Sequence, residues 1–422
     1  MFKSLFSLTI CLPLIFLFTL QKASAETVVL SGWGGFDRLV IQKILSDVVA
    51  TELTQANIQV AYTALESSHN SFLLNRFSSG KAPDVFYVDV SDIHRLAKLD
   101  LLYNFSYGAP ELVNRIYPEL NQLFTIRGET FGIVKDYNTI SMQFNKDLFR
   151  AAKVPFLTDS ETFASLEDKL AKLAAHLKPK GQISICLTPD YASFAPFALS
   201  AGWQPFTENG QTQLDENFIT AFRFYVGLVR KGIAAVPNNV GHTWSSGCLT
   251  SGLSAVSVEG TWINQHIQIH APNLNFATVA PPVSSAEKKP GNLIFAVAWA
   301  VNRNSAQLDK SLQLIQILTS QKVQHFIWNN AVALPASNQV IMKAKAGNTA
   351  SENQLFQSTA RILATSQLYP YQFERYGSAW MAPINKALRS AMLSNRPLEQ
   401  LIQEAQKAYL AMYKEVYVDA QP

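Results

Sequence analysis

Short apolar runs and helical segments alternate near the N-terminus, and this alternation restricts the fold more than any other feature of the chain. Residues 27–31, 58–62 and 85–88 are β-branched or apolar runs of strand length. Residues 39–53 and 71–77 separate them; the first segment repeats apolar residues at helical spacing and the second ends near a Ser-Gly pair. Strands that alternate with helices form parallel sheets with a helix on each crossover, so we predict a doubly wound α/β sheet.

The same pattern returns later in the chain. Strands are predicted at residues 183–187, 255–258 and 293–301, and helices at residues 218–231, 308–319 and through most of 377–417. No linker rich in Pro, Ser or Gly separates the two regions. We therefore predict two α/β lobes joined by short, ordered crossings.

The first 25 residues are predicted to be a cleaved secretory signal peptide. Lys3 supplies a positive charge, residues 5–20 are uncharged and broken only by Pro13, and residues 23–25 form a small-residue cleavage pattern before Glu26. The alternative is an uncleaved membrane anchor, for which the apolar stretch is short, because a span needs about 20 residues. We expect the cleaved chain to be exported, soluble and nearly neutral.

The composition of the chain excludes disorder and nucleic-acid binding. Hydrophobic residues make up 48% of the 422 positions and charged residues 16%, whereas disordered chains combine low hydrophobicity with high net charge. The 35 basic residues barely exceed the 31 acidic ones, and the sequence has no run of Lys or Arg. A nucleic-acid binder would need a basic patch.

Two cysteines remain after cleavage, and their state bears on the compartment. Cys186 is on a predicted strand, and Cys248 begins the segment that leads to another strand of the same lobe. An oxidising compartment permits a disulfide between them. The alternative is two separate buried thiols, which behave as small hydrophobic side chains.

The sequence lacks the common motifs for catalysis, nucleotides and metals. It contains no G-x-x-x-x-G-K-[ST] phosphate loop, no G-x-S-x-G elbow and no H-E-x-x-H pair. His266 and His270 are four residues apart and would share a helix face, but no third ligand is evident and the helix should end near residues 271–272. We interpret them as surface histidines and predict neither a cofactor nor a metal.

Tryptophans mark the candidate binding site. The chain has seven, and three of them, Trp33, Trp203 and Trp262, stand in turn-like contexts beside or near glycines. A Trp on a loop at the carboxyl end of a parallel strand points into the crevice where α/β proteins bind ligands. Its indole face suits the apolar face of a sugar ring. About half of the seven should instead pack in the core, since Trp is highly buried in any fold.

Five segments give the chain a resemblance to a known family. They are residues 79–85 (SGKAPDV), 144–149 (FNKDLF), 247–262 (ending in EGTW), 300–305 (AVNRNS, before a helix) and 334–335 (LP). In this order behind a signal peptide they resemble the motifs of the extracellular solute-binding proteins of ABC importers. The sugar-binding group that includes the maltose-binding proteins is the most similar.

The resemblance implies a fold and a division of the chain. The family has two lobes joined by two or three strand crossings (the periplasmic-binding-protein-like fold, type II), with a sugar in the cleft between them. From the motif order we expect residues 26–136 and 293–338 in lobe 1, and residues 140–290 and 345–422 in lobe 2.

The resemblance also implies a set of ligand-binding residues. Carried over one position at a time, these are the stacking aromatics Trp262 and Trp380, the hydroxyl-binding acids Asp89 and Asp92, the first strand–helix loop with Trp33 and Asp37, and Tyr137 with Asn138 before the first crossing. Trp203 joins them because of its Gly-Trp context. Asp84, in contrast, is expected to cap a turn. Residues 189–197 lack the aromatic-rich loop of the maltose binders, which counts against maltodextrin as the ligand.

The function implied is that of a monomeric, periplasmic carbohydrate-binding component of an importer, and not of an enzyme. The lobes would close on the sugar, and the closed form would dock on the ABC permease subunits in the inner membrane. One alternative is a secreted carbohydrate-active enzyme, which needs two carboxylates about 5–9.5 Å apart across a cleft. The other is the same fold with a metal or an anion as its ligand.

Overall fold

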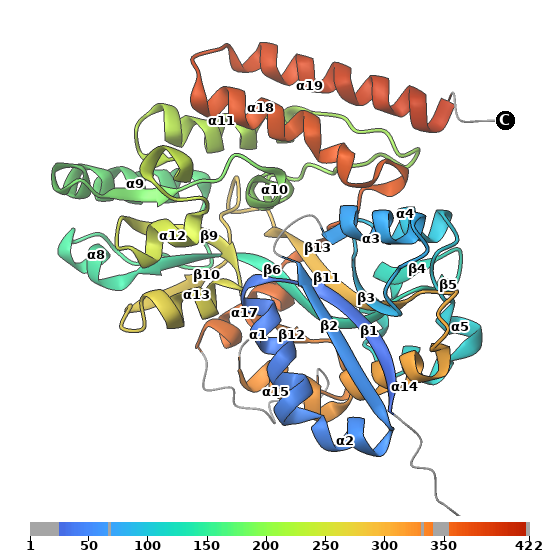
Figure 1. Cartoon of the computed structure of the whole chain (residues 1–422). Coiled ribbons are helices and arrows are strands. Elements are labelled where there is room, and N and C mark those ends of the chain that lie inside the picture. The colour runs from blue at the N-terminus through green and yellow to red at the C-terminus, as the bar shows by residue number, and fades with distance from the viewer. Residues whose placement is uncertain (1–24, 66–68, 331–332, 341–353, 419–422) are drawn as a thin grey trace, which may run out of the picture.

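One mixed sheet runs through the whole molecule (Figure 1). The computed structural model describes residues 25–65, 69–330, 333–340 and 354–418, so the expected signal peptide lies outside the described residues except for Ala25. The strand order is β2-β1-β3-β11-β6-β9-β7-β8, and β10, β12 and β13 attach to β6 or β11. In the described part of the chain, no helix has the length and apolar character that crossing a membrane requires.

The strands of this sheet vary from two to thirteen residues. They are β1 (Glu26–Trp33), β2 (Ile58–Leu65), β3 (Val85–Asp89), β6 (Ile133–Asn145), β7 (Ile183–Cys186), β8 (Ala234–Ala235), β9 (Ser254–Gly260), β10 (Phe276–Val279), β11 (Gly291–Val301), β12 (Leu334–Pro335) and β13 (Gln367–Pro370). A separate hairpin pairs β4 (Thr125–Ile126) with β5 (Glu129–Thr130). The predicted strands at 183–187, 255–258 and 293–301 are confirmed as β7, β9 and β11.

The N-terminal strands are parallel, as the alternating pattern predicted. β1 pairs in parallel with β2 along its whole length and with β3 at Leu30 and Ser31. The predicted helix over residues 39–53 is not continuous, however. It is divided into α1 (Gly35–Lys43), a π-helical turn (Ile44–Val48) and α2 (Ala50–Gln55), because Val49 has a ψ of 13° and leaves the helical region.

Two long strands, β6 and β11, belong to both halves of the sheet. β6 pairs antiparallel with β11 over Ile133–Thr139 and then with β9 over Ile140–Phe144. β11 pairs with β13 at its beginning and with β3 at its end. The antiparallel direction of these two strands departs from a purely parallel sheet, and it makes them the crossings between the two halves.

Apolar side chains gather in two large clusters, which define the lobes. Lobe 1 is centred on buried side chains such as Leu30, Phe86 and Ile315, and lobe 2 on others such as Ile185 and Phe222. The crossing strands contribute to both clusters. The first residues of β6 pack in the lobe 1 cluster, and its later residues pack in the lobe 2 cluster. Each lobe therefore has its own core, which is what allows two lobes to move as separate bodies.

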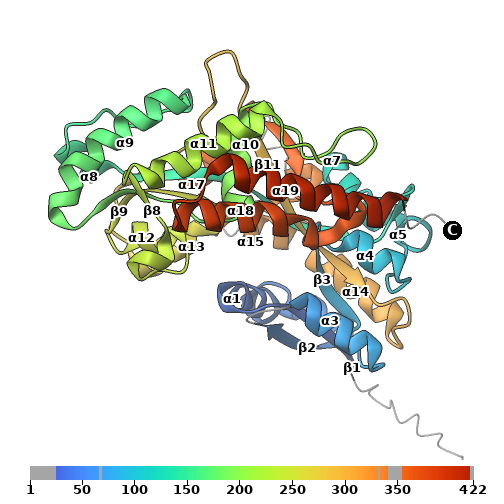
Figure 2. The ribbon, with the colours of Figure 1, turned by 90° about the horizontal axis from the view of Figure 1, so that it is seen from above.

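Helices cover both faces of the sheet. Those of lobe 1 are α1, α2, α3 (His69–Ser78), α4 (Ile93–Lys98), α5 (Phe105–Gly108), α6 (Pro110–Val113), α7 (Pro118–Asn121), α14 (Leu308–Leu318) and α15 (Gln321–Asn329). Those of lobe 2 are α8 (Lys146–Ala151), α9 (Phe163–Leu177), α10 (Tyr191–Ser200), α11 (Glu216–Arg230), α12 (Ser245–Thr250), α13 (Ile263–His270), α17 (Gln354–Thr365), α18 (Ala382–Leu393) and α19 (Leu398–Tyr413). Figure 2 shows α18 and α19 lying side by side over lobe 2.

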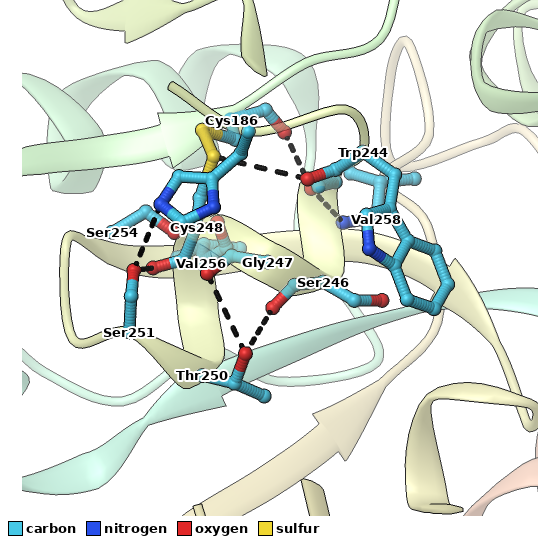
Figure 3. Close-up of a disulfide and its surroundings, with 12 residues drawn as sticks. Cys186, Trp244, Ser246, Gly247, Cys248, Thr250, Ser251, Ser254, Val256 and Val258 are labelled. Atoms are coloured by element: carbon cyan, nitrogen blue, oxygen red, sulfur yellow. Dashed lines mark hydrogen bonds between the residues drawn. A yellow bond between two sulfur atoms is a disulfide. The ribbon is translucent and has the colours of Figure 1, made fainter. Parts of the chain in front are cut away.

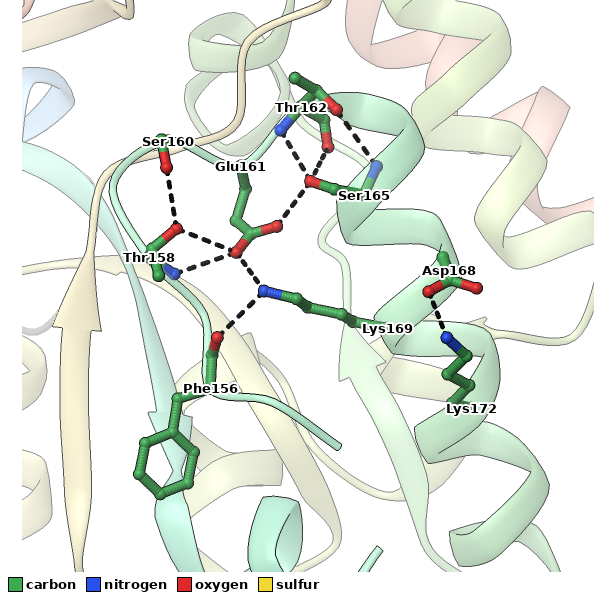
Figure 4. A network of polar contacts seen from close by, with 9 residues as sticks. All are labelled: Phe156, Thr158, Ser160, Glu161, Thr162, Ser165, Asp168, Lys169 and Lys172. Carbon is green, nitrogen blue, oxygen red and sulfur yellow. Dashed lines mark hydrogen bonds and ion pairs between the residues drawn. The ribbon is translucent and has the colours of Figure 1, made fainter. Parts of the chain in front are cut away.

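A buried carboxylate fixes the loop between α8 and α9 (Figure 4). The carboxylate of Glu161 accepts hydrogen bonds from the Lys169 ammonium at 2.5 Å and from the Thr158 backbone N–H at 3.0 Å. Burial raises the pKa of Glu161, but the bonds from Lys169, Ser165 and Thr158 outweigh it and lower the pKa. Thr162 and Ser165 complete a reciprocal cap on the first turn of α9.

A disulfide joins Cys186 at the end of β7 to Cys248 in α12 (Figure 3). Both cysteines are fully buried, and the Ser245 hydroxyl in the first turn of α12 donates to the Cys186 carbonyl at 2.8 Å. The sequence left open whether these cysteines pair, and the structure pairs them. The bond fastens α12 to the sheet immediately before β9.

Replacing both cysteines (Cys186→Ala with Cys248→Ala) is expected to lower the free energy of unfolding by about 4 kcal/mol, because the bond closes a loop with a sequence separation of 62 in the unfolded chain. Guanidinium unfolding of the oxidised protein and of the double variant measures the difference. Wild-type protein kept reduced is the control and should lose a similar amount. A loss below about 1 kcal/mol would contradict the prediction.

Candidate ligand-binding site

Two cavities lie between the lobes, one on each side of Trp33. Cavity 1 has a volume of about 620 Å³ and cavity 2 of about 590 Å³, and Trp33 lines both. Trp33 is the last residue of β1, and its ring stands edge-on to the buried Tyr87 with 5.5 Å between the centroids. The carboxyl end of a parallel strand is where α/β proteins bind ligands, and Trp33 keeps 36% of its surface exposed there.

Acidic and polar side chains form the lobe 1 wall of cavity 1. Asp89 ends β3, and its carboxylate accepts a hydrogen bond from the Ser91 backbone N–H at 2.7 Å. The Asp92 carboxylate accepts hydrogen bonds from the Asn70 amide and, at 3.3 Å, from the Ser91 hydroxyl. Arg95 follows one turn later in α4. All five residues line the cavity, and the ligand-binding role expected for Asp89 and Asp92 stays a prediction.

The two acids are held in an environment that disfavours their charge. Burial raises the pKa of Asp89 to about 6, although the hydrogen bonds from Ser91 oppose the shift. Burial also raises the pKa of Asp92, against the bond from Ser91 and the charge of Arg95.

Lobe 2 contributes a tyrosine and one helical turn to cavity 1. Tyr371 lines the cavity together with Ser378 and Met381, and it packs against the cores of both lobes. Gly377, immediately before Ser378, has a φ of 61° and a ψ of −164°. Only glycine adopts this conformation without strain, so the turn that brings Ser378 and Met381 to the cavity depends on it.

Trp203 and Trp380, two of the expected ligand residues, do not reach either cavity. Both are fully buried in the core of lobe 2, with their rings stacked at 6.4 Å. Each indole N–H already donates within the core, Trp203 to the Gln213 carbonyl and Trp380 to the Thr212 hydroxyl, both at 2.7 Å. The structure places the Trp380 side chain in the core, and Ser378 and Met381 of the same segment line cavity 1 instead.

Three indoles surround cavity 2. Trp33, Trp244 and Trp262 line it, so three of the seven tryptophans lie at the cleft. The remaining four, Trp203, Trp299, Trp328 and Trp380, are buried. Trp262 donates its indole N–H to the Glu259 carboxylate at 2.8 Å and meets the ring of Phe295, on the crossing strand β11, edge-on at 5.6 Å. Its ring is therefore held by both β9 and β11.

A buried group of charges forms the floor of cavity 2. The Lys135 ammonium lies 2.5 Å from a carboxylate oxygen of Asp136 and 3.3 Å from one of Asp37. Burial alone would lower the pKa of Lys135, but the two carboxylates outweigh it and raise the pKa. A β-bulge places Lys135: β11 residues Val297 and Ala298 pair with Asp136 and Val134, which leaves Lys135 as the extra residue.

The side chains of two neighbouring residues of β6 point in different directions. Asn138 lines cavity 2, as expected. Tyr137 lines neither cavity and packs instead on Trp328 and Leu334 of lobe 1. Successive side chains of a strand point to opposite faces, so only one of the two expected residues could face the cleft.

Two histidines stand at the edge of cavity 2. His266 and His270 line it, and their ring centroids are 4.3 Å apart. Helix α13 ends at His270, close to the predicted break. Burial lowers the pKa of His266, and the neighbouring His270 and His242 add to the effect. The described residues contain no group of three His, Cys, Asp or Glu side chains that could hold a metal ion.

Several residues of the site were not found from the sequence. They are Asn70, Arg95, Lys135, Asp136, Trp244, Gln265 and Tyr371. Lys135 and Asp136 carried a signal, since a charged pair inside a strand that crosses both cores must be satisfied internally. Tyr371 carried no such signal in the sequence. Its position depends on the pairing of β13, which precedes it, with β11.

A family model for bacterial extracellular solute-binding proteins matches residues 52–350. The match covers more than half of the chain, so the chain belongs to the family of bacterial extracellular solute-binding proteins. No curated protein matches the chain.

Solved structures resemble the chain in fold. An ABC substrate-binding protein from Listeria monocytogenes in complex with cycloalternan is 15% identical, with a TM-score of 0.79 over 91% of this chain and 98% of that one. The GacH receptor of Streptomyces glaucescens, solved unliganded and with acarbose, is 20% identical, with a TM-score of 0.79 over 92% and 98%. The sugar-binding protein MalE from Xanthomonas citri is 17% identical, with a TM-score of 0.76 over 94% and 100%.

Asp89→Asn is expected to stabilise the ligand-free protein at pH 8 by about 1–3 kcal/mol. The pKa of Asp89 is raised to about 6 in the folded chain, so its contribution to stability is present at low pH and lost as the pH rises through 6. The gain from the variant should therefore vanish below about pH 4. Denaturant unfolding at both pH values measures it, with Asp47→Asn as the control, since Asp47 is exposed and lines neither cavity. Equal stability of Asp89→Asn and wild type at pH 8 would contradict the prediction.

Trp380→Ala is expected to lower the free energy of unfolding by about 3–5 kcal/mol, because it leaves a cavity in the lobe 2 core. Denaturant unfolding measures this loss. Trp262→Ala, at the edge of the same core, should cost less stability. Should Trp380→Ala unfold at the wild-type denaturant concentration, the assignment of Trp380 to the core would be wrong.

Proposed function

We propose that this protein is the periplasmic, monomeric binding component of an ABC importer for a carbohydrate, and that it is not an enzyme. The observation that carries the proposal is the interlobe cleft, in which indole faces lie in the same cleft as the carboxylates of Asp89 and Asp92, whose pKa values are raised by burial. Sugar rings present apolar C–H faces and polar hydroxyl edges, and this combination of side chains suits both. The solved relatives with cycloalternan and acarbose support the same class of ligand.

The ligand proposed is an oligosaccharide rather than a single sugar. The two cavities have volumes of about 620 and 590 Å³ and share the Trp33 wall. Each falls within the range of a small-molecule site by itself. A ligand of two or more sugar units could occupy both, with its units on either side of the Trp33 ring.

We also propose the division of the chain that the motif order implied. Residues 26–136 and 293–338 would form lobe 1, and residues 140–290 and 345–422 lobe 2. The composition of the two apolar clusters supports these boundaries. Trp33, Asp37, Asp89 and Asp92 would bind the ligand from lobe 1, Asn138 from the crossing strand β6 and Trp262 from lobe 2, so closure of the lobes would complete the site. The closed form would then dock on the permease.

The charges of the cleft argue against the alternatives. In cavity 1, Asp89 and Asp92 outnumber Arg95, which disfavours an anion. In cavity 2, both Asp37 and Asp136 are bound to Lys135, so neither is a free acid or nucleophile for glycoside hydrolysis. Release of reducing sugar by the purified protein would instead favour a secreted enzyme.

A thermal-shift screen over mono- and oligosaccharides, polyols, divalent metals and inorganic anions tests the ligand class. A ligand present at 100 times its dissociation constant should stabilise the protein by about 2.7 kcal/mol, because it binds only the folded state. We expect oligosaccharides to give the largest shifts. A shift only with metals or anions would contradict the proposal.

Trp33→Ala and Trp262→Ala are each expected to weaken saccharide binding by about 5- to 150-fold, the range for a lost contact of about 1–3 kcal/mol. Calorimetry measures the affinity, and small-angle scattering should show less ligand-driven compaction in both variants. Tyr107→Ala is the control, since Tyr107 is 80% exposed and lines neither cavity. If only one lobe's variant weakened binding, the ligand would rest on a single lobe, and closure around it would lose its support.

A further inference from the structure

The segment Glu259–Trp262 connects the end of β9 to the start of α13, and its last residue lines cavity 2. The main-chain carbonyl of Glu259 accepts hydrogen bonds from Ser141 at 3.2 Å and from Gln143 at 3.1 Å, both on the crossing strand β6. A side chain at Gly260 would collide with the Trp262 ring, whose atoms come within 2.3 Å of the position a Cβ would take. The glycine therefore lets the indole lie directly over the strand end.

The carboxylate of Glu259 is the fixed partner of the Trp262 indole. Glu259 is 7% exposed and does not line either cavity, so it has no direct access to a ligand. Its Oε2 accepts the indole N–H at 2.8 Å. An indole can donate only through this one group, so the bond sets the rotation of the ring that faces cavity 2.

We propose that Glu259 is a positioning residue for ligand binding, and that gain or loss of its proton tunes how firmly Trp262 is held against the ligand. An ionised carboxylate accepts an N–H more strongly than a neutral carboxyl does, because the bond is charge-assisted. The ring should therefore be held most firmly when Glu259 is ionised. The effect on affinity rests on the proposed function, whereas the hold on the indole does not.

The surroundings of Glu259 raise its pKa toward neutral pH. Burial raises the pKa of Glu259 to about 7, against the bond from Trp262, and the charge of Asp190, which follows β7, raises it further. The backbone N–H groups of Ser246 and Ser245 act in the opposite direction. Tyr225 of α11 is the other ionisable neighbour, and burial raises its pKa far above neutrality, so it stays protonated. Burial also raises the pKa of Asp190, and it lowers the pKa of His266, which lines cavity 2 with Trp262. Glu259 is the one of these groups that is bonded to the Trp262 indole.

The test follows the Trp262 indole directly, without a ligand. The seven indole N–H groups of the ¹⁵N-labelled protein are recorded from pH 5 to pH 9, and Trp262→Phe assigns the Trp262 signal. We expect this signal to move with a midpoint near pH 7 and to stand still in Glu259→Gln, whose amide oxygen can still accept the bond but cannot ionise. Asp190→Asn should move the midpoint to lower pH, because it removes a neighbouring negative charge.

The second arm measures affinity for maltotriose, cellotriose and mannotriose between pH 6.5 and pH 8.5, where Asp89 is mostly ionised. Binding should tighten by about two- to fourfold across this range in wild type, because the ionised fraction of Glu259 rises about fourfold, and it should stay constant in Glu259→Gln. A Trp262 signal that does not titrate, or that titrates equally in Glu259→Gln, overturns the proposal, as does an equal pH response of affinity in both proteins. If none of the three saccharides binds while the signal titrates as expected, the hold on Trp262 stands and the proposed function is in error.

Discussion

The pairing of β6 with β11 is the constraint on which the rest of the molecule depends. Both strands pass from one core to the other, and their antiparallel ladder carries the β-bulge at Lys135. The residues beside this ladder, Asn138 and Phe295, are direct partners across it. Asn138 lines cavity 2, and the ring of Phe295 packs against Trp262. The crossing between the lobes and the wall of cavity 2 are therefore made from the same few residues, so a rotation of one lobe against the other would act on both.

The two cavities differ in how their carboxylates are held. Cavity 1 keeps carboxylates close to apolar surroundings, which costs stability in the ligand-free protein. Cavity 2 pairs its two carboxylates, Asp37 and Asp136, with Lys135 and is lined by three indoles. A binding protein can tolerate the strain of the first half because the ligand relieves it, in the same way that strained or unsatisfied groups persist at functional sites elsewhere.

Much of the fold could be predicted from the sequence, because periodicity reports local structure. The parallel order of β1, β2 and β3 followed from the alternation of strands and helices, and the end of α13 from the position of Ala271 and Pro272. The antiparallel crossing strands were not predicted as such, since pairing between residues 133–139 and 294–299 is a long-range contact with no local signal.

The candidate site was predictable only in part, and particular side chains show why. Trp33, Asp89 and Asp92 follow strands whose ends must meet at one edge of the sheet, so their position could be reasoned out. Trp380 could not be placed, because the direction of its side chain depends on the kink at Gly377. Tyr137 failed for a simpler reason: one step along a strand turns a side chain to the opposite face.

Trp33 lines both cavities. A substitution of Trp33 therefore alters both halves of the cleft together. A smaller residue there would change the lining of both cavities at once. Residues that line a single cavity, such as Asn70 in the first or Gln265 in the second, leave the other half untouched. Substitutions that change ligand preference during evolution should therefore accumulate first at such positions. Trp33 should stay constant, because it lines both cavities.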